Sequence, residues 1–545
     1  MNAKTNTRTD TPGPDDVHVG SFFLETLTTG MYENPFHCIR EYVQNGFDAI
    51  QDAIRNEILP VGEGRILISI GGSQRSPSIT IQDNGTGIAS EHAVRILMSL
   101  GASRKNPSRH AGFRGIGRLA GIAYCTTLRF TTTAQNEVVA TTIEFDCGQI
   151  RGYFSPGADP VDVREVVSSS TRMSTTASSE GEHYTKVEMI GLVNLGLEFA
   201  DLKILEPYLS EVCPVEYPDN FPFADQIRSF AEGFGDNLPT VHVETKQKRE
   251  RRPVLKPYRS NYPAGRRVSK LHSIEPVSSK ENGWFGWLGV SNFPGEISDH
   301  TVAGIRFRSK NIQVDGMSII QRLAEETTVS GTDRRLMTYA VGEIHITNPH
   351  IIPNARRDGF EDTEAWRLVR EEIKKRVVKR VKTLVRAAQT TRSAIKAVKD
   401  LLQKLTVRLE ISEITEFEKT EIDELIRKQV RELSSPTKFL GADPKEVSQL
   451  TASFKELAEA LKDLPIAGDE ENDDDETDAD TGTNDSSDDK STDEGNVPNE
   501  DDNGAEEPKD PKFEIVLKML LTELDEAQAK RLARHIVEAL GDKSY

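Results

Sequence analysis

Three polar residues with helical spacing are the first candidates for chemistry. Glu41, Asn45 and Asp48 lie in the segment IREYVQNGFDAIQDAIR, residues 39–55, at positions i, i+4 and i+7. On a helix this spacing places all three on one face. A carboxylate beside an amide oxygen suits a site where Asn45 ligates magnesium and Glu41 deprotonates a water for attack on a phosphate. An ordinary solvated helix face has the same spacing, so this segment alone leaves both interpretations open.

The segment ITIQDNGTGI, residues 79–88, is a second candidate because a predicted strand runs directly into a polar turn. Asp83 stands at the strand end, and Gly85 and Gly87 follow it. A carboxylate there can accept a hydrogen bond from an exocyclic amine such as that of adenine, while glycine permits positive φ and close backbone approach to a ligand. A simple Asp-Asn-Gly turn is the structural alternative.

A glycine-rich turn follows in HAGFRGIGRLAGIAYC, residues 110–125, with glycines at 112, 115, 117 and 121 opening an apolar helix. Backbone N–H groups of such a turn, with the helix N-terminus behind them, form a cradle for phosphate oxygens. The spacing differs from the dinucleotide fingerprint, and no acidic residue follows at a strand end about 20 positions on. A nicotinamide cofactor is therefore a poor interpretation.

Taken in order, these segments resemble the GHKL ATPase superfamily, which includes gyrase, heat-shock chaperones, histidine kinases and MutL. The family pattern is a helix with Glu, Asn and Asp, a DxGxG turn, a GxxGxG turn and a later Thr. All four parts occur here, the last as Thr185 in HYTKVEMIGL. The resemblance implies binding and slow hydrolysis of ATP with magnesium in an N-terminal α/β sandwich.

The same resemblance implies a role for each matching position. Glu41 would be the general base, Asn45 the magnesium ligand and Asp83 the residue that reads adenine. Asp48 would join the site or chiefly order its helix. The other positions that the resemblance places at the nucleotide are Gly85, Gly87, Gly112, Gly115, Gly117 and Thr185.

The segment LGASRKNPSRHAG, between the second and third motifs, resembles the ATP lid of the family. Ser103 and Lys105 could reach phosphates from this region, as could Arg114 just after it. Ordinary exposed loop positions are the alternative for all three.

Two later segments, GIRFRSKNIQVDG and GEIHITNPHIIPNARRDGFED, resemble the transducer domain of chaperone-like members. There the family supplies a basic side chain to the γ-phosphate. Arg357 is the first candidate, ahead of Arg356 and Lys310, because a guanidinium can neutralise charge on the transferred phosphoryl group. An Arg–Asp pair that holds the loop is the structural alternative.

Apolar periodicity predicts the elements that must position these residues. Strand-like alternation occurs at residues 65–70, 78–83, 128–133, 140–145 and 185–190, and several of these strands could pair in one sheet. Further strands are predicted before residue 355, and a long basic helix is predicted from about residue 363. We therefore expect an α+β protein that ends in a helical region.

The resulting domain prediction has six parts. They are a flexible tail (1–20), a GHKL ATP-binding domain (21–200), a second α+β, transducer-like domain (201–360), a helical region (361–467), a disordered acidic linker (468–511) and a C-terminal helical segment (512–545). The resemblance covers about residues 21–390, and the later segments do not match the dimerisation domain of the chaperones.

Composition limits the remaining possibilities. The net charge of −19 comes almost wholly from the tract Asp469–Asp510, where 20 Asp or Glu accompany only two Lys, so it says nothing about what the folded domains bind. No apolar run reaches the roughly 20 residues of a membrane span. The four cysteines are scattered, which argues against a disulfide framework or a zinc site. We expect a soluble protein in the cytoplasm.

Three functions remain open at this level. The first is a chaperone-like, ATP-gated clamp, a homodimer that acts on a protein client. The second is a MORC-like or defence-associated ATPase that acts on DNA or with a nucleic-acid enzyme, for which residues 246–270 supply ten Lys or Arg against Glu250. A solvated basic hairpin is the alternative for that run. The third is a nucleotide switch without turnover, against which Glu41 argues.

Overall fold

The computed structural model describes residues 19–466, except 29, 31–33, 102, 104, 113, 156, 328–331, 411–413, 436–438 and 440–441. The chain divides into two compact units, residues 1–469 and 470–545, and the described residues all belong to the first. The predicted acidic linker and C-terminal segment, with most of the predicted N-terminal tail, lie outside the described residues.

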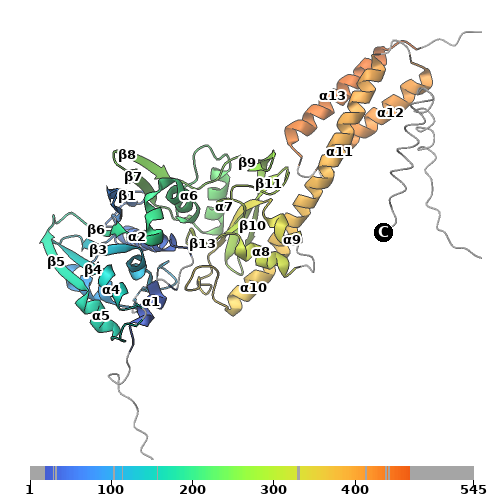
Figure 1. Ribbon diagram of the computed structural model, residues 1–545. Coiled ribbons are helices and arrows are strands. Elements are labelled where there is room, and N and C mark those ends of the chain that lie inside the picture. Colours follow the sequence, from blue (N-terminus) through green and yellow to red (C-terminus); the bar gives the residue numbers. More distant parts are fainter. Residues whose placement is uncertain are drawn as a thin grey trace, which may run out of the picture. The chain divides into compact units, whose positions relative to one another are not determined.

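An eight-stranded sheet organises the N-terminal region, in the order β5-β4-β3-β6-β2-β1-β7-β8 (Figure 1). Its strands are β1 (Arg65–Ser73), β2 (Ser76–Asp83), β3 (Cys125–Thr133), β4 (Val139–Asp146), β5 (Thr171–Ala177), β6 (Tyr184–Leu192), β7 (His242–Gln247) and β8 (Glu250–Val254). Only the β1–β7 pair among them is parallel. The five alternations seen in the sequence correspond to β1, β2, β3, β4 and β6, so the prediction of one sheet is confirmed.

Two features of this sheet were not predicted. β5 shows no apolar alternation because it is an edge strand whose residues are almost all exposed. β7 and β8 come from beyond residue 200, where the sequence suggested a domain boundary, yet β7 pairs with β1. The sheet therefore continues to Val254.

Helices of the N-terminal region pack on the sheet and supply much of its core. They are α1 (Phe22–Thr28), α2 (His37–Arg55), α3 (Ser90–Met98), the 3₁₀ helix η2 (Gly117–Ala123), α4 (Cys147–Gly152), α5 (Val163–Ser169), the 3₁₀ helix η3 (Asn194–Ala200) and α6 (Leu202–Val212). The next helix, α7 (Ala224–Phe234), belongs instead to a separate core with Tyr258, Phe285 and Trp287. The rotation of α2 follows from its apolar stripe, in which Ile39, Val43, Phe47 and Ile50 are all buried. This stripe leaves the neighbouring polar face free to line a site.

A six-stranded sheet forms the second α+β region, in the order β13-β12-β14-β11-β10-β9. Its strands are β9 (Asn261–Ala264), β10 (Arg267–Ser279), β11 (Trp284–Ser291), β12 (Gly304–Ser309), β13 (Ile312–Asp315) and β14 (Val341–Ile346), and α8 (Ser318–Glu325) and α9 (Thr332–Met337) accompany them. Every residue of β14 is buried, as expected for a central strand.

The predicted helical region is confirmed. It consists of α10 (Glu364–Ile373), a π-helical turn η4 (Lys374–Val378), α11 (Lys379–Leu409), α12 (Glu416–Leu433) and α13 (Pro444–Asp463). Figure 1 shows α11, α12 and α13 side by side, and they share an apolar core of their own. No helix in the described part of the chain combines the length and the apolar character needed to cross a membrane.

Candidate active site

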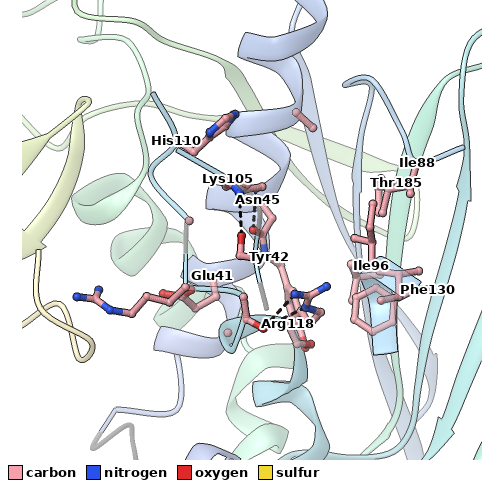
Figure 2. A pocket seen from close by; sticks show the side chains of 18 of the residues that line it. Glu41, Tyr42, Asn45, Ile88, Ile96, Lys105, His110, Arg118, Phe130 and Thr185 are labelled. Carbon is pink, nitrogen blue, oxygen red and sulfur yellow. Dashed lines mark hydrogen bonds between the residues drawn. The ribbon is translucent and has the colours of Figure 1, made fainter. Parts of the chain in front are cut away.

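The polar face of α2 borders a cavity of about 540 Å³. Glu41 and Asn45 line it, together with glycines of the later turn and with Ala355 and Arg357 from the loop after β14. Figure 2 shows Glu41, Asn45 and Lys105 on one side of this cavity and Thr185 with apolar side chains on the other. The cavity therefore has a charged end and an apolar end.

Asp48, the third polar residue on α2, holds the glycine turn in place. Its carboxylate is buried and accepts hydrogen bonds from the backbone N–H groups of Ala111 (2.7 Å) and Gly112 (2.8 Å). It also accepts one from Lys105 Nζ at 3.1 Å. Asp48 of α2 thus holds both the glycine turn and the segment around Lys105 in place.

Lys105 places a positive charge at the charged end. Its Nζ donates to Asn45 Oδ1 at 3.3 Å, a bond drawn dashed in Figure 2, and also to Asp48. Ser103 supports the same segment, because its Oγ accepts from the backbone N–H of Lys105 at 3.2 Å. Both residues line the cavity, in positions from which they can face phosphate oxygens.

Glu41 lies against two features that come from distant parts of the chain. Arg357 Nε stands 3.4 Å from Glu41 Oε1, and Arg357 Nη2 donates to the backbone carbonyl of Ala111. On the other side, a Cβ added to Gly117 would lie 2.2 Å from Glu41 Oε2. A glycine at 117 is therefore what lets the start of η2 approach this carboxylate.

The loop that carries Arg357 adopts a constrained backbone, with φ of +58° at this residue. Glu41 of α2 is a carboxylate partner of this guanidinium, so Arg357 joins the loop to the helix that carries the proposed base. Arg114 faces the same loop, since Nη1 donates to Pro353 O (2.9 Å) and Nη2 pairs with Glu361 Oε1 (2.6 Å). Arg40 Nη2 donates to Arg356 O at 3.3 Å.

Lys310, a further candidate for the γ-phosphate, lies elsewhere. Its Nζ donates to the backbone carbonyls of Pro107 and His110, each at 2.7 Å. The ammonium group therefore contacts the lid, and it is absent from the lining of the cavity.

Asp83, the last residue of β2, lies at the apolar end of the cavity. Its side chain is buried, with 7% of the residue exposed, and Oδ1 accepts from the N–H of Gly85 at 2.9 Å. Burial raises the pKa of this carboxyl to about 6, against hydrogen bonds from the backbone of Gly85 and Thr185 and the charge of Lys105. A buried carboxylate beside an apolar wall suits a neutral ring with an exocyclic amine.

Thr185 pairs with Asp83 across β2 and β6. Its Oγ1 lies 3.2 Å from Thr132 Oγ1, which also accepts the N–H of Ile88 at 2.9 Å. These hydroxyls join the strand ends to the DxGxG turn. Sequence reasoning placed Thr185 at the site and did not include Thr132.

The two glycine positions of the DxGxG turn leave no room for a larger side chain. A Cβ at Gly85 would lie 2.6 Å from the backbone carbon of Ala49, and one at Gly87 would lie 1.8 Å from Thr133 O. Gly87 also has φ of +63°. One more glycine, Gly46 on α2, lets the helix approach Asp83, because its added Cβ would meet the Asp83 side chain at 3.0 Å.

The sequence motifs did not include the apolar residues that line the cavity. In the sheet, Val187 pairs with both Ile81 and Phe130, two positions along from the Asp83–Thr185 pair. Strand period two therefore places them on the same face as Asp83, and this signal could have found them. The apolar residues that line the cavity include Ile81, Ile88, Ile96, Leu97, Phe130 and Val187.

Several polar residues of the cavity were also missed, among them Tyr42, Arg118 and His110. Tyr42 OH donates to Arg118 O and accepts from Gly121 N, both at 3.0 Å, which ties α2 to η2. Arg118 donates to Gly115 O at 3.0 Å, and burial lowers its pKa to about 10. His110 Nε2 lies 3.0 Å from Asp52 Oδ2, a contact that joins the segment before the glycine turn to α2.

Magnesium fits the donor set at the charged end. Mg²⁺ in nucleotide sites takes one or two protein oxygens and completes its shell with phosphates and waters. Asn45 offers a neutral oxygen, Glu41 a carboxylate nearby, and Lys105 shows that a cation is accommodated at Asn45 Oδ1. Clusters of three or more His, Cys, Asp or Glu that could hold a metal do not occur among the described residues.

The basic segment 246–270 includes the β7–β8 hairpin, and eight of its ten Lys and Arg residues are exposed. Arg251 lies 3.5 Å from Glu244, and Arg252 lies 2.8 Å from Glu250. Lys256 is buried and binds Glu343 at 2.9 Å. Exposed basic side chains on a hairpin fit both the solvated hairpin and a surface that binds DNA, so binding to DNA stays a prediction.

A carboxylate and an amide on one helix face, a glycine turn and a buried carboxylate at a strand end thus border one cavity or lie beside it. Residues 32–156 match the family model described as histidine kinase-, DNA gyrase B-, and HSP90-like ATPase. This part of the chain is a GHKL-type ATPase domain, which supports ATP binding and a nucleotide-dependent ATPase function. Thr185 and Arg357 lie beyond the matched residues. Comparison with curated proteins finds no match.

Proposed function

We propose that the protein binds ATP with magnesium in this cavity and hydrolyses it slowly, to drive a chaperone-like conformational cycle. One observation carries the proposal: Glu41 lines the same cavity as Asn45, Asp83 and the glycine turn, and Arg357 reaches it from a segment far along the chain. A base, a magnesium ligand, a phosphate cradle and a cationic side chain, the groups that phosphoryl transfer uses, would then all come from one cavity.

The roles follow from the chemistry of each group. Asp83 and Thr185 receive adenine, and Gly112, Gly115 and Gly117 present backbone to the phosphates. Bound Mg²⁺ neutralises phosphate charge when held by Asn45. Glu41 orients a water and accepts its proton. Lys105 and Arg357 balance charge on the phosphoryl group.

The contact between Glu41 and Arg357 supports a conformational cycle. A γ-phosphate near Glu41 would compete with this carboxylate for the guanidinium of Arg357, so ATP would change the contact between α2 and the loop 353–361. The neighbouring contacts of Arg114 with Glu361 and of Arg40 with Arg356 would move with it. Clamp closure in a homodimer and a protein client are the finer parts of this proposal.

The test is steady-state ATP hydrolysis with magnesium, alongside nucleotide binding, for the intact protein, Glu41→Ala and Asp83→Asn. We expect Glu41→Ala to bind ATP while turnover falls roughly 10²- to 10⁴-fold, as for loss of a general base. Asp83→Asn should bind poorly. Equal hydrolysis by all three proteins would refute the assignment, and tight binding without turnover in the intact protein would indicate a switch.

A further inference from the structure

Lys310 stands at the tip of the hairpin formed by β12 and β13. Ser309 pairs with Ile312, so the turn consists of Lys310 and Asn311 alone. Both have positive φ, +53° and +61°, as a type I′ turn requires. Asn tolerates this region, whereas a lysine there is uncommon. The conformation of the tip must therefore be held by its surroundings.

A buried charged network holds the tip from behind. Asn311 Oδ1 accepts from Lys256 Nζ at 2.9 Å, and Asn311 Nδ2 donates to Pro239 O at 3.1 Å. Arg308 Nη1 donates to the carbonyl of Asn311 at 3.0 Å. Lys256 and Arg308 share the carboxylate of Glu343 on the central strand β14, and all three are almost fully buried. Such a network fixes one arrangement of the hairpin, because each charge depends on its neighbours.

The fixed tip directs Lys310 to the lid segment, defined here as Lys105–Gly112. Nζ donates to two carbonyls of that segment, Pro107 O and His110 O, each at 2.7 Å. Burial lowers the pKa of Lys310 to about 8, with the nearby Asp48 carboxylate opposing this. The side chain is therefore mostly charged at neutral pH, and its hydrogen bonds are of the strong, charge-assisted kind.

The two carbonyls lie between the parts of the lid segment that meet the site. At one end Lys105 donates to Asn45 and Asp48, and at the other Gly112 donates to Asp48. The His110 side chain binds Asp52 on α2. The segment is thus held by α2 on one side and by Lys310, from the second sheet, on the other.

We propose that Lys310 is a positioning residue that holds the lid segment closed over the nucleotide and couples the lid to the second sheet. This deepens the proposed ATPase cycle and rests on it. Lys310 acts through the backbone of Pro107 and His110 and does not touch the phosphates. It is separate from Arg357, which reaches Glu41 from the loop after β14.

Hydrogen exchange on the full-length protein without nucleotide tests the contact directly. The proteins are wild type, Lys310→Met, Lys310→Arg and Lys396→Met, the last altering an exposed lysine of α11 as a matched control. In Lys310→Met we expect amides of residues 105–112 to exchange roughly 10- to 100-fold faster, from the loss of two charge-assisted bonds. Amides of β14 should not change, and Lys310→Arg should restore protection in part.

Dissociation of a fluorescent ATP analogue is the second readout, and we expect it to accelerate roughly tenfold or more in Lys310→Met. Unchanged exchange at residues 105–112 would overturn the proposal. Equal acceleration in β14 would also overturn it, since Lys310 would then only support the hairpin. If the analogue failed to bind the wild type, the proposed ATPase would be refuted, while the exchange data would still decide whether Lys310 holds the segment.

Discussion

Arg357 Nε lies 3.4 Å from Glu41 Oε1, which joins the loop after β14 to the polar face of α2. The same guanidinium donates to the carbonyl of Ala111, beside the glycine turn. One arginine thus contacts both the proposed base and the backbone next to the proposed phosphate cradle. Its position predicts an effect on turnover that is separable from an effect on nucleotide binding.

Replacing Arg357 by Ala should lower kcat roughly 10²- to 10⁴-fold, because charge on the phosphoryl group loses its counter-charge and Glu41 loses a partner. ADP affinity should change little, since the adenine end is distant from this loop. Arg357→Lys should recover part of the rate. Stopped-flow nucleotide binding and single-turnover hydrolysis separate the two effects.

Arg356→Ala is the matched control for that prediction. Arg356 is exposed, and its backbone carbonyl makes the contact with Arg40, so the side chain can be removed without disturbing it. Wild-type turnover in Arg357→Ala, or loss of ADP binding as severe as the loss of turnover, would contradict the assigned role.

Gly117→Ala should displace the Glu41 carboxylate, because the added Cβ would lie 2.2 Å from Oε2. A shift of about 1 Å in a catalytic group can reduce turnover about 10²-fold, while binding through Asp83 should persist. Gly152→Ala, in α4 of the same region, has open space around the added Cβ and serves as the control. A fully active Gly117→Ala enzyme would show that Glu41 does not need its present position.

Replacing the buried Gln44 by an apolar residue should stabilise the protein. It is 1% exposed, and its Nε2 and Oε1 have no hydrogen-bond partner among the described residues. Unpaired buried polar groups cost about 1–3 kcal/mol each, so Gln44→Met should raise the free energy of unfolding by at least about 1 kcal/mol in urea titrations. Gln149→Met, at an exposed position of α4, should stay within about 0.5 kcal/mol.

The same variant also tests whether Gln44 serves the nucleotide. Its Nε2 lies beside Gly112, since a Cβ built there would be 2.8 Å away. If Gln44→Met bound ATP much more weakly than wild type, the amide would have a partner in the nucleotide-bound protein, and if the variant were destabilised, the predicted gain in stability would be wrong. Retained binding with higher stability is the expected result.

Much of the site followed from sequence because each motif is local. Glu41, Asn45 and Asp48 share a face of α2 by helical period, and the Asp83 turn follows a strand whose alternation is plain. Spacing of this kind depends on backbone geometry alone. These positions were therefore predictable before any tertiary contact was known.

The contacts between distant segments were not predictable in the same way. Spacing could not show that Lys310 binds lid carbonyls or that His110 binds Asp52, because both depend on how two folded regions meet. Nor could spacing show that Arg114, which lines the cavity, contacts Pro353 and Glu361 of the loop after β14. β5 was missed because its polar, exposed edge leaves no apolar alternation.

The last prediction concerns the pH dependence of ATP binding at Asp83, whose pKa burial raises to about 6. An exocyclic amine donates better to the carboxylate than to the protonated acid, so binding favours the charged form. Affinity should therefore be highest above pH 6 and fall as pH drops through 6, to about tenfold weaker at pH 5. Calorimetry at pH 7 and pH 5 measures this. Asp83→Asn should bind weakly at both values, and subtracting its profile removes the titration of the phosphates and other groups. If Asp83→Asn kept the wild-type slope, the carboxyl of Asp83 would not be the group that reads the base.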